Sequence, residues 1–231
     1  GDWTSPTQPY SVGMPTISAP RLTEKSMWGI TPLDQLWCRI AFKKLRYDGD
    51  MTPPRTKPSL LFPGVFGGFN WGSASIDETR DYLIVNDIRI GHQLALIPRA
   101  EVDRDGEKVL RRFGAEKSVP GHSLFLPQKG TPFGAVFLKF FSPVGLPCQA
   151  PPYGTLTAID LKTKKIAWQV PMGTTSDTGP LGIRMYLPIP IGLPTIGGSL
   201  VTKSGLVFFA GSQDFYLRAI DSASGREVWK G

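Results

Sequence analysis

The chain has 231 residues, of which 26 are Lys or Arg and 19 are Asp or Glu, so its formal net charge is +7. It contains 26 Gly and 22 Pro, and 41% of its residues are hydrophobic. This apolar content excludes a disordered chain, and the many helix-breaking residues favour an all-β or loop-rich architecture over a helical bundle. The excess positive charge is scattered, which argues against a nucleic-acid partner.

No apolar run is long enough to cross a membrane. The first residues, GDWTSPTQPYS, have no signal-peptide pattern. This leaves either a cytoplasmic protein or a piece of a longer chain whose targeting segment lies elsewhere.

One amphipathic helix is predicted at 31–46, TPLDQLWCRIAFKKLR. Thr31 is a suitable N-cap and Pro32 suits the first helical position. Five apolar residues fall on one face at helical spacing, and we expect that face to pack in the core. They are Leu33, Leu36, Trp37, Ile40 and Leu45.

Two segments follow in the middle of the chain. Residues 73–88, SASIDETRDYLIVNDI, predict a strand pair around a turn at Asp77 and Glu78, which we interpret as a weakly marked third blade. Residues 99–117 mix charges of both signs and are predicted to be a solvated surface insertion.

A pattern repeats in the last third of the chain, at 154–168 (GTLTAIDLKTKKIAW) and 215–229 (FYLRAIDSASGREVW). In both copies Ala-Ile-Asp precedes a polar turn and a strand that ends in Trp168 or Trp229. The Asp can accept hydrogen bonds from amides of the turn, and we expect each Trp to be buried against a neighbouring sheet. With the hairpin at 199–212, strands are predicted at 199–202, 206–210, 215–220 and 226–229. Four antiparallel strands of this kind are typical of a β-propeller blade.

The segment 185–198, MYLPIPIGLPTIGG, contains three prolines and is predicted to be an extended connector. Cys38 and Cys148 form no CxxC pair, and two buried free thiols are favoured over a single disulfide. The two histidines, His92 and His122, are isolated, so the usual His-centred metal and nucleophile sites are not predicted.

No complete catalytic set is visible from the residues alone. Polar residues in Gly-rich or strand-end positions are Asn70, Asn86, Asp87, Asp177 and Asp214. Turn capping is the ordinary role of Asn and Asp beside Gly. The phosphate-binding GxGxxG and GxxxxGK[ST] patterns are absent from the sequence, so a nucleotide cofactor has no support.

Several segments resemble the pyrroloquinoline quinone (PQQ) dehydrogenases, specifically the membrane-bound glucose/quinate/shikimate branch. The segments that carry the resemblance are TSPTQPYS (4–11), MWGITPLDQLWCRIAFKKLRYDG (27–49), FPGVFGGFNWGSASID (62–77), LPCQAPPYGTLTAIDLKT (146–163) and GSQDFYLRAID (211–221). The resemblance covers nearly the whole chain except 99–117. It implies an all-β fragment of a β-propeller, residues 1–231, with four-stranded blades, tryptophan-docking motifs, an incomplete ring and one inserted helix.

The resemblance also implies a function. Such enzymes oxidise a sugar or cyclic polyol in the periplasm with PQQ held on a divalent cation, calcium or magnesium, and pass electrons to ubiquinone. The proton-accepting Asp and the quinone-contacting Lys precede the PTQPxS signature in the family, so the fragment alone is expected to be inactive. Asn86 matches a PQQ-pocket residue, and Asp177 and Asp214 match positions linked to electron transfer toward ubiquinone. The membrane anchor would lie in N-terminal segments outside this chain.

The substrate divides this branch. Quinate and shikimate carry a carboxylate, whose recognition calls for a cation. Arg89 and Arg184 lie close in sequence to the pocket candidates, which favours quinate or shikimate over glucose; the alternative is that both are surface salt-bridge partners. A non-catalytic propeller scaffold of the outer-membrane assembly type is the competing function, but it needs neither the helix-bearing segment nor the GGFNWGS loop.

Overall fold

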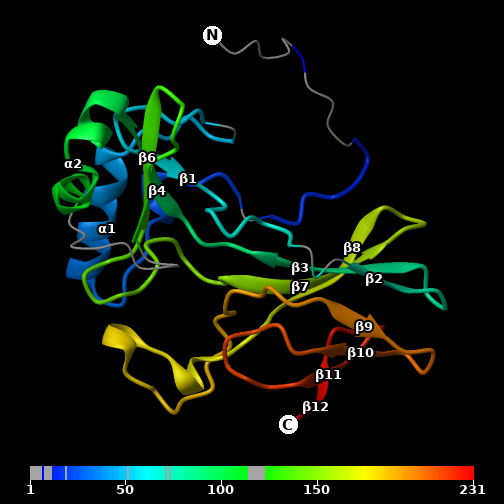
Figure 1. Cartoon of the computed structure of the whole chain (residues 1–231). Coiled ribbons are helices and arrows are strands. Elements are labelled where there is room, and N and C mark those ends of the chain that lie inside the picture. Colours follow the sequence, from blue (N-terminus) through cyan, green and yellow to red (C-terminus); the bar gives the residue numbers. More distant parts are fainter. Residues whose placement is uncertain are drawn as a thin grey trace.

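The chain is built from three four-stranded antiparallel sheets (Figure 1). The computed structural model describes residues 7, 12–18, 20–50, 52–70, 72, 74–113 and 123–231. Two of the sheets are propeller blades, and in the described chain they do not close into a ring, as the sequence predicted. The third sheet lies beside the two α-helices (Figure 1).

The first blade has the strand order β2-β3-β7-β8. Its strands are β2 (Ala74–Asp77), β3 (Tyr82–Ile88), β7 (Gly154–Asp160) and β8 (Lys165–Pro171). The predicted hairpin at 73–88 is therefore present from residue 74 on, but its interpretation as a third blade is wrong. It pairs through β3 with β7 and supplies half of the first blade, because the ladder runs from Tyr82 opposite Asp160 to Ile88 opposite Gly154.

The segment between β3 and β7 carries the third sheet, of order β1-β4-β6-β5, which the sequence did not predict. Its strands are β1 (Ser59–Leu61), β4 (His92–Pro98), β5 (Ser123–Leu126) and β6 (Phe133–Lys139). Only β1 comes from outside this segment. The first blade therefore keeps its strand order although the long segment between β3 and β7 separates its two hairpins.

The second blade, β9 (Ser199–Val201), β10 (Leu206–Phe209), β11 (Arg218–Asp221) and β12 (Glu227–Lys230), confirms the four predicted strands. Its hairpins repeat those of the first blade: Trp229 pairs with Ala219 as Trp168 pairs with Ala158, and a register shift follows each Ala. The turn chemistry is also confirmed. Asp160 accepts hydrogen bonds from the amides of Lys162 and Thr163, at 2.8 and 3.0 Å.

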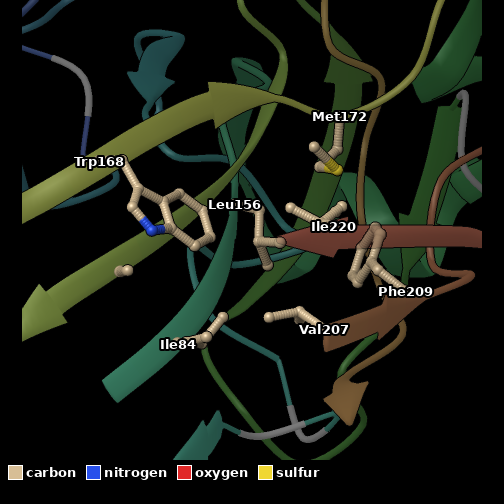
Figure 2. Close-up of a cluster of buried hydrophobic side chains, with 8 residues drawn as sticks. Ile84, Leu156, Trp168, Met172, Val207, Phe209 and Ile220 are labelled. Atoms are coloured by element: carbon tan, nitrogen blue, oxygen red, sulfur yellow. The ribbon is translucent and has the colours of Figure 1, made fainter. Parts of the chain in front are cut away.

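The main apolar core lies between the two blades (Figure 2). It contains Ile84, Leu156, Ala158, Trp168, Met172, Val207, Phe209 and Ile220. Trp168 is buried as predicted, and its indole Nε1 donates to the carbonyl oxygen of Ser222 at 2.8 Å. Gly225, at φ +73°, lies so close that a Cβ there would be 2.7 Å from the indole ring. Trp229, in contrast, is 51% exposed, so its predicted burial is wrong: no sheet of the described chain lies against it.

The predicted helix is α1 (Pro32–Lys44), capped by the Thr31 side chain, which accepts from the amide of Asp34. Its predicted core face is wrong. Leu33, Leu36, Trp37 and Ile40 are exposed, and the buried side is formed by Asp34 and Cys38 with Ala41, Phe42 and Leu45 packed beside them. The reason is covalent: Cys38 forms a disulfide with Cys148, which turns its own face of the helix inward. The expectation of two free thiols is therefore wrong as well.

A second helix, α2 (Arg99–Arg112), occupies most of the segment predicted to be a solvated insertion. Val102, Val109 and Leu110 are buried against Ala95, Ile97 and Val136 of the third sheet. These apolar residues share one helical face, so the segment packs while Asp103, Arg104, Lys108, Arg111 and Arg112 are exposed. Residues 114–117 lie outside the described chain. Short 3₁₀ turns occur at η1 (Glu24–Ser26), η2 (Thr175–Asp177) and η3 (Pro180–Gly182), and 185–198 is an extended connector as predicted. In the described part, no helix is both long and apolar enough to span a bilayer.

Candidate functional site

The strand order brings the candidate residues to one edge of the two blades. In antiparallel sheets the end of one strand meets the start of the next, so 62–72, 89–153, 172–198 and 210–217 all join strands at this edge. The edges of the two blades coincide, because the hydroxyls of Ser75 and Ser199, at the start of β2 and β9, are 2.6 Å apart. This edge of the blades thus contains Asn70, Asn86, Arg89, Asp177 and Asp214.

Glycine backbones pack directly at the entry to this edge. A Cβ on Gly198 would lie 1.9 Å from the carbonyl oxygen of Gly72, and one on Gly72 would lie 2.5 Å from the amide nitrogen of Gly198. Neither position accepts a side chain unless the backbone moves. This contact holds the GGFNWGS loop against the connector between the blades.

Asn86 lies two residues before the end of β3 and is buried. Its Nδ2 donates to the carbonyl oxygen of Thr195 at 2.8 Å and to Thr195 Oγ1 at 3.2 Å. Thr195 Oγ1 in turn donates to the carbonyl oxygen of Asp87 at 3.0 Å. The amide nitrogen is therefore occupied by a residue from the connector, and no hydrogen bond of Oδ1 with another described residue is seen.

Arg89 forms a buried ion pair with Asp87, Nε to Oδ2, at 2.6 Å. Its Nη2 donates to the carbonyl oxygen of Ile17 at 2.6 Å and to Thr155 Oγ1 at 3.3 Å. Thr155 Oγ1 also donates to Asp87. Arg89 is thus not a surface salt-bridge partner: it fastens residues 12–18 to the sheet edge.

Asp214 is the centre of a second buried network. Its carboxylate accepts from Arg218 Nη1 at 2.9 Å and from Ser212 Oγ at 2.5 Å, and the amide of Thr174 donates to it at 3.0 Å. Burial acts to raise the pKa of Asp214, but the hydrogen bonds from Arg218 and Ser212 outweigh it, so the pKa lies below its usual value. Asp214 therefore ties the connector after β8 to the β10–β11 loop as a carboxylate.

Asp177 lies at the end of η2 and is partly exposed, with Arg184 Nη1 3.6 Å from its Oδ1. The side chain of Arg184 is more exposed than that of its partner. Of the two candidate cations for a substrate carboxylate, Arg184 is consequently the less committed.

Asn70 is the candidate with an unsatisfied donor. Its Nδ2 is buried and has no hydrogen-bond partner among the described residues. A buried amide of this kind costs free energy unless a ligand or water completes it. Sequence analysis identifies Asn70 as a candidate but gives no reason to prefer it over the other polar residues beside Gly.

The partners that hold the candidates were missed by sequence reasoning. Thr155 and Arg218 lie inside the repeated hairpins but were not singled out, and Thr195 meets Asn86 only through the fold. The described residues contain no group of three or more His, Cys, Asp or Glu side chains placed to hold a metal. His122 and most of TSPTQPYS lie outside the described residues. This edge of the blades thus supplies hydrogen-bond donors and acceptors in fixed orientations, and Arg184 as an exposed cation.

Comparisons with known proteins identify the family of the chain. The family model described as PQQ, glucose/ethanol/alcohol dehydrogenase, beta-propeller domain, matches residues 1–231. The chain is 55% identical to a probable quinate dehydrogenase (quinone) of Xanthomonas campestris pv. juglandis over 98% of its length, and 52% identical over 100% of it to the quinate/shikimate dehydrogenase (quinone) of Acinetobacter baylyi. It spans 28% of the length of each.

More distant matches are also named as dehydrogenases. The chain is 36% identical to the quinoprotein glucose dehydrogenase of Escherichia coli, covering 100% of itself and 28% of that protein. The quinohemoprotein alcohol dehydrogenase of Comamonas testosteroni is a structural match over 76% of this chain and 20% of that one, with 20% identity and a TM-score of 0.41. The chain belongs to the PQQ-dependent glucose/ethanol/alcohol dehydrogenase β-propeller family.

Proposed function

We propose that the protein to which this chain belongs is a PQQ-dependent dehydrogenase that oxidises quinate or shikimate. The observation that carries the proposal is the order of identities. They are 55% and 52% to proteins named quinate or quinate/shikimate dehydrogenase, 42% to a glycerol dehydrogenase large subunit and 37% to a glucose dehydrogenase. The dehydrogenase names also favour an enzyme over a non-catalytic scaffold.

The residues at the blade edge fit a cofactor that offers several oxygen acceptors. The buried Nδ2 of Asn70 is a donor with no partner among the described residues, whereas Nδ2 of Asn86 is bound to Thr195 and its Oδ1 is an acceptor, suited to an N–H group or to the divalent cation. We infer that these two amides contact PQQ, which supplies the hydride acceptor and is held with a divalent cation. The catalytic base is assigned to a segment before this chain, so the chain alone should not turn over substrate.

For the substrate carboxylate, Arg184 is the better of the two candidates. Arg89 has its guanidinium bound by Asp87, Thr155 and Ile17, whereas Arg184 has one long contact. A cation that retains donors can form the charge-assisted pair that a carboxylate requires. We keep Arg89 as a positioning candidate that fixes the strand end.

The roles assigned to Asp177 and Asp214 in electron transfer toward ubiquinone are proposals from the family resemblance. The partial exposure of Asp177 is compatible with contact to an acceptor. Asp214 is buried in its ion pair with Arg218 and would act through the loop that it holds.

We also propose a periplasmic location, with the membrane anchor in segments outside this chain. The Cys38–Cys148 disulfide supports it, because disulfides persist in oxidising compartments.

The test is a dye-reduction assay of the full-length protein loaded with PQQ and calcium, with quinate, shikimate, glucose and glycerol compared. We expect kcat/KM for quinate or shikimate to exceed that for glucose by at least about tenfold, because a cation that pairs with the carboxylate finds no counterpart in glucose. Turnover of glucose without turnover of either acid would contradict the proposal. Arg184→Gln should remove the preference, and Arg184→Lys should retain part of it.

A further inference from the structure

A buried histidine lies beneath the loop that carries Asn70. Residues 62–70, here called the Asn70 loop, lead from the end of β1 toward the start of β2. His92, the first residue of β4, is 2% exposed, and neither of its ring nitrogens has a hydrogen-bond partner among the described residues. The rest of the full-length protein can only add to this burial. A buried polar group without a partner costs free energy and calls for an explanation.

The imidazole packs directly against the backbone of the Asn70 loop. A Cβ on Gly64 would lie 1.9 Å from Nδ1 of His92, so the ring fills the place of a side chain at Gly64. The ring of Phe66 meets the imidazole edge to face, and the two ring centroids are 5.4 Å apart. The amide of Gly64 donates to the carbonyl oxygen of Ile90 at 2.6 Å. The first half of the loop therefore rests on His92.

The loop is tied along its length up to Asn70. The amide of Gly67 donates to the carbonyl oxygen of Gly64 at 2.9 Å. The amide of Ile88 donates to the carbonyl oxygen of Gly68 at 2.8 Å. Asn70 follows Gly68 by two residues, so the position of its amide depends on how this part of the loop is held.

The surroundings of His92 favour its neutral form. Burial lowers its pKa to about 4, and the charge of Lys139, which lies opposite on β6, acts in the same direction. The nearby carbonyl oxygen of Ile90 acts the other way but is outweighed. The sequences of β1 and the Asn70 loop contain no titratable side chain. Tyr153, which packs with Phe66 in the adjoining apolar cluster, has its pKa raised by burial and stays uncharged.

Protonation is the property that distinguishes an imidazole from an apolar side chain at this position. A charged ring would be buried beside Lys139 while the loop is in place. When the loop is released, the ring meets water and takes up a proton at its ordinary pKa of 6.5. Because the released state binds the proton more tightly, acid favours release, by up to about tenfold per pH unit between the two pKa values.

We propose that His92 is a positioning residue that holds the Asn70 loop in place, with Nδ2 of Asn70 directed at the cofactor, only while its imidazole is neutral. The proposal rests on the proposed contact of Asn70 with PQQ and does not depend on the identity of the substrate. Release of the loop in acid would withdraw that donor and weaken PQQ binding.

Hydrogen exchange of the full-length protein measures release of the loop directly. Peptides that contain 64–68 report the bonded amides of Gly64 and Gly67, and peptides from β3 report the ladder with β7 as the internal control. From pH 6.5 to 4.5 we expect protection of the loop amides in the wild type to fall by about 10- to 100-fold, while that of the ladder is kept.

The matched variants are His92→Leu and His92→Gln, whose side chains cannot be protonated. Both should lose the pH dependence of loop protection, and the use of two variants guards against a packing defect in one of them. PQQ affinity, measured by quenching of tryptophan fluorescence at constant calcium, should follow the same course. Over the same pH range it should weaken by at least about tenfold more in the wild type than in either variant.

Three results would overturn the proposal. Equal pH dependence of loop protection in the wild type and the His92 variants would show that the imidazole does not control the loop. Release of the loop without loss of PQQ affinity would show that the loop does not position a cofactor contact. Wild-type PQQ affinity of Asn70→Ala would remove the contact on which the proposal rests, whereas the first result leaves that contact intact.

Discussion

The side chain of Asn86 directs its amide nitrogen at the connector, so its first role is structural. Asn86→Ala would remove the bonds to Thr195 and leave a buried carbonyl oxygen without that donor. We expect the free energy of unfolding of the chain to fall by about 1–3 kcal/mol. Chemical denaturation followed by tryptophan fluorescence measures this.

Asn70→Ala is the matched control, because its amide nitrogen has no partner to lose among the described residues. It should leave the stability of the chain nearly unchanged. In the full-length protein both substitutions should weaken PQQ binding if the proposed contacts are correct. Wild-type stability of Asn86→Ala would show that the bonds to Thr195 contribute nothing.

Asp214 makes stability depend on pH. Its pKa is lowered in the folded chain, so the ionised form contributes stability above the ordinary carboxyl pKa, and that contribution is lost as the pH falls through the lowered folded value. Asp214→Asn should cost about 3–5 kcal/mol near neutral pH, because it leaves Arg218 buried without its main partner. The gap between wild type and variant should begin to narrow below a pH of about 4 and should narrow further as the pH falls through the lowered folded pKa.

Urea unfolding at a series of pH values tests this, with Asp177→Asn as the control. The Asp177 pair with Arg184 is long and partly exposed, so its loss should cost less than about 1 kcal/mol. A gap for Asp214→Asn that does not change with pH would contradict an ionised carboxylate as its source.

At the scale of elements, the two repeated hairpins have the same register but different surroundings. Trp168→Ala should destabilise the chain by about 3–5 kcal/mol, because it empties the space between the blades and removes the bond to Ser222. Trp229→Ala should cost clearly less, since half of that side chain already meets solvent. Equal losses in denaturant titrations would show that Trp229 is covered in solution.

The disulfide joins α1 to the segment before β7 across 110 residues of chain. Replacing both cysteines with Ser should lower the stability of the oxidised chain by up to about 5 kcal/mol, mainly because the unfolded chain loses a long closed loop. Thermal melts of the double variant and of the reduced wild type should agree. Unchanged melting of both would mean that the link adds no stability.

The sequence predicted the elements whose signals are local. Alternation and turn residues place the strands of the second blade, and Thr31 with Pro32 places the start of α1. It failed where distant segments decide. The buried face of α1 depends on Cys148, and the first blade depends on β3 pairing with a strand beyond a long insertion.

The residues of the candidate site could likewise be predicted only where the signal is local. Asn70, Asn86 and Asp214 were recognised as polar residues beside Gly or at a strand end, and the strand order does bring them to one edge. Whether each side chain is already occupied depends on its partners: Thr195 is 109 residues from Asn86, and Arg218, although near Asp214 in sequence, has no feature that predicts the bond. Burial and partners therefore separate the free donor of Asn70 from the occupied amide of Asn86.

At the scale of the whole molecule, both outer blade faces are open in the described chain. On the second blade Leu200, Phe208, Ala219 and Trp229 form a cross-strand row, of which Leu200 and Trp229 are exposed. On the first blade a different row, Ile76, Leu83, Ile159 and Ile166, lies outside the core, with both end residues exposed. Trp229 pairs with Ala219 as Trp168 pairs with Ala158, but only Trp168 is covered by the neighbouring blade, at Ser222 and Gly225.

Open apolar rows of this kind should make the isolated chain self-associate. Sedimentation velocity over a range of concentrations should show species larger than a monomer that increase with concentration. Leu200→Glu with Trp229→Glu should shift the chain toward monomer without loss of the core between the blades, because neither residue belongs to that core. Leu33→Glu is the control: it also replaces an exposed apolar residue by a charge, but on α1 and away from both rows. A compact monomer at the highest concentration, or equal shifts for the control and the double variant, would show that the blade faces do not drive association.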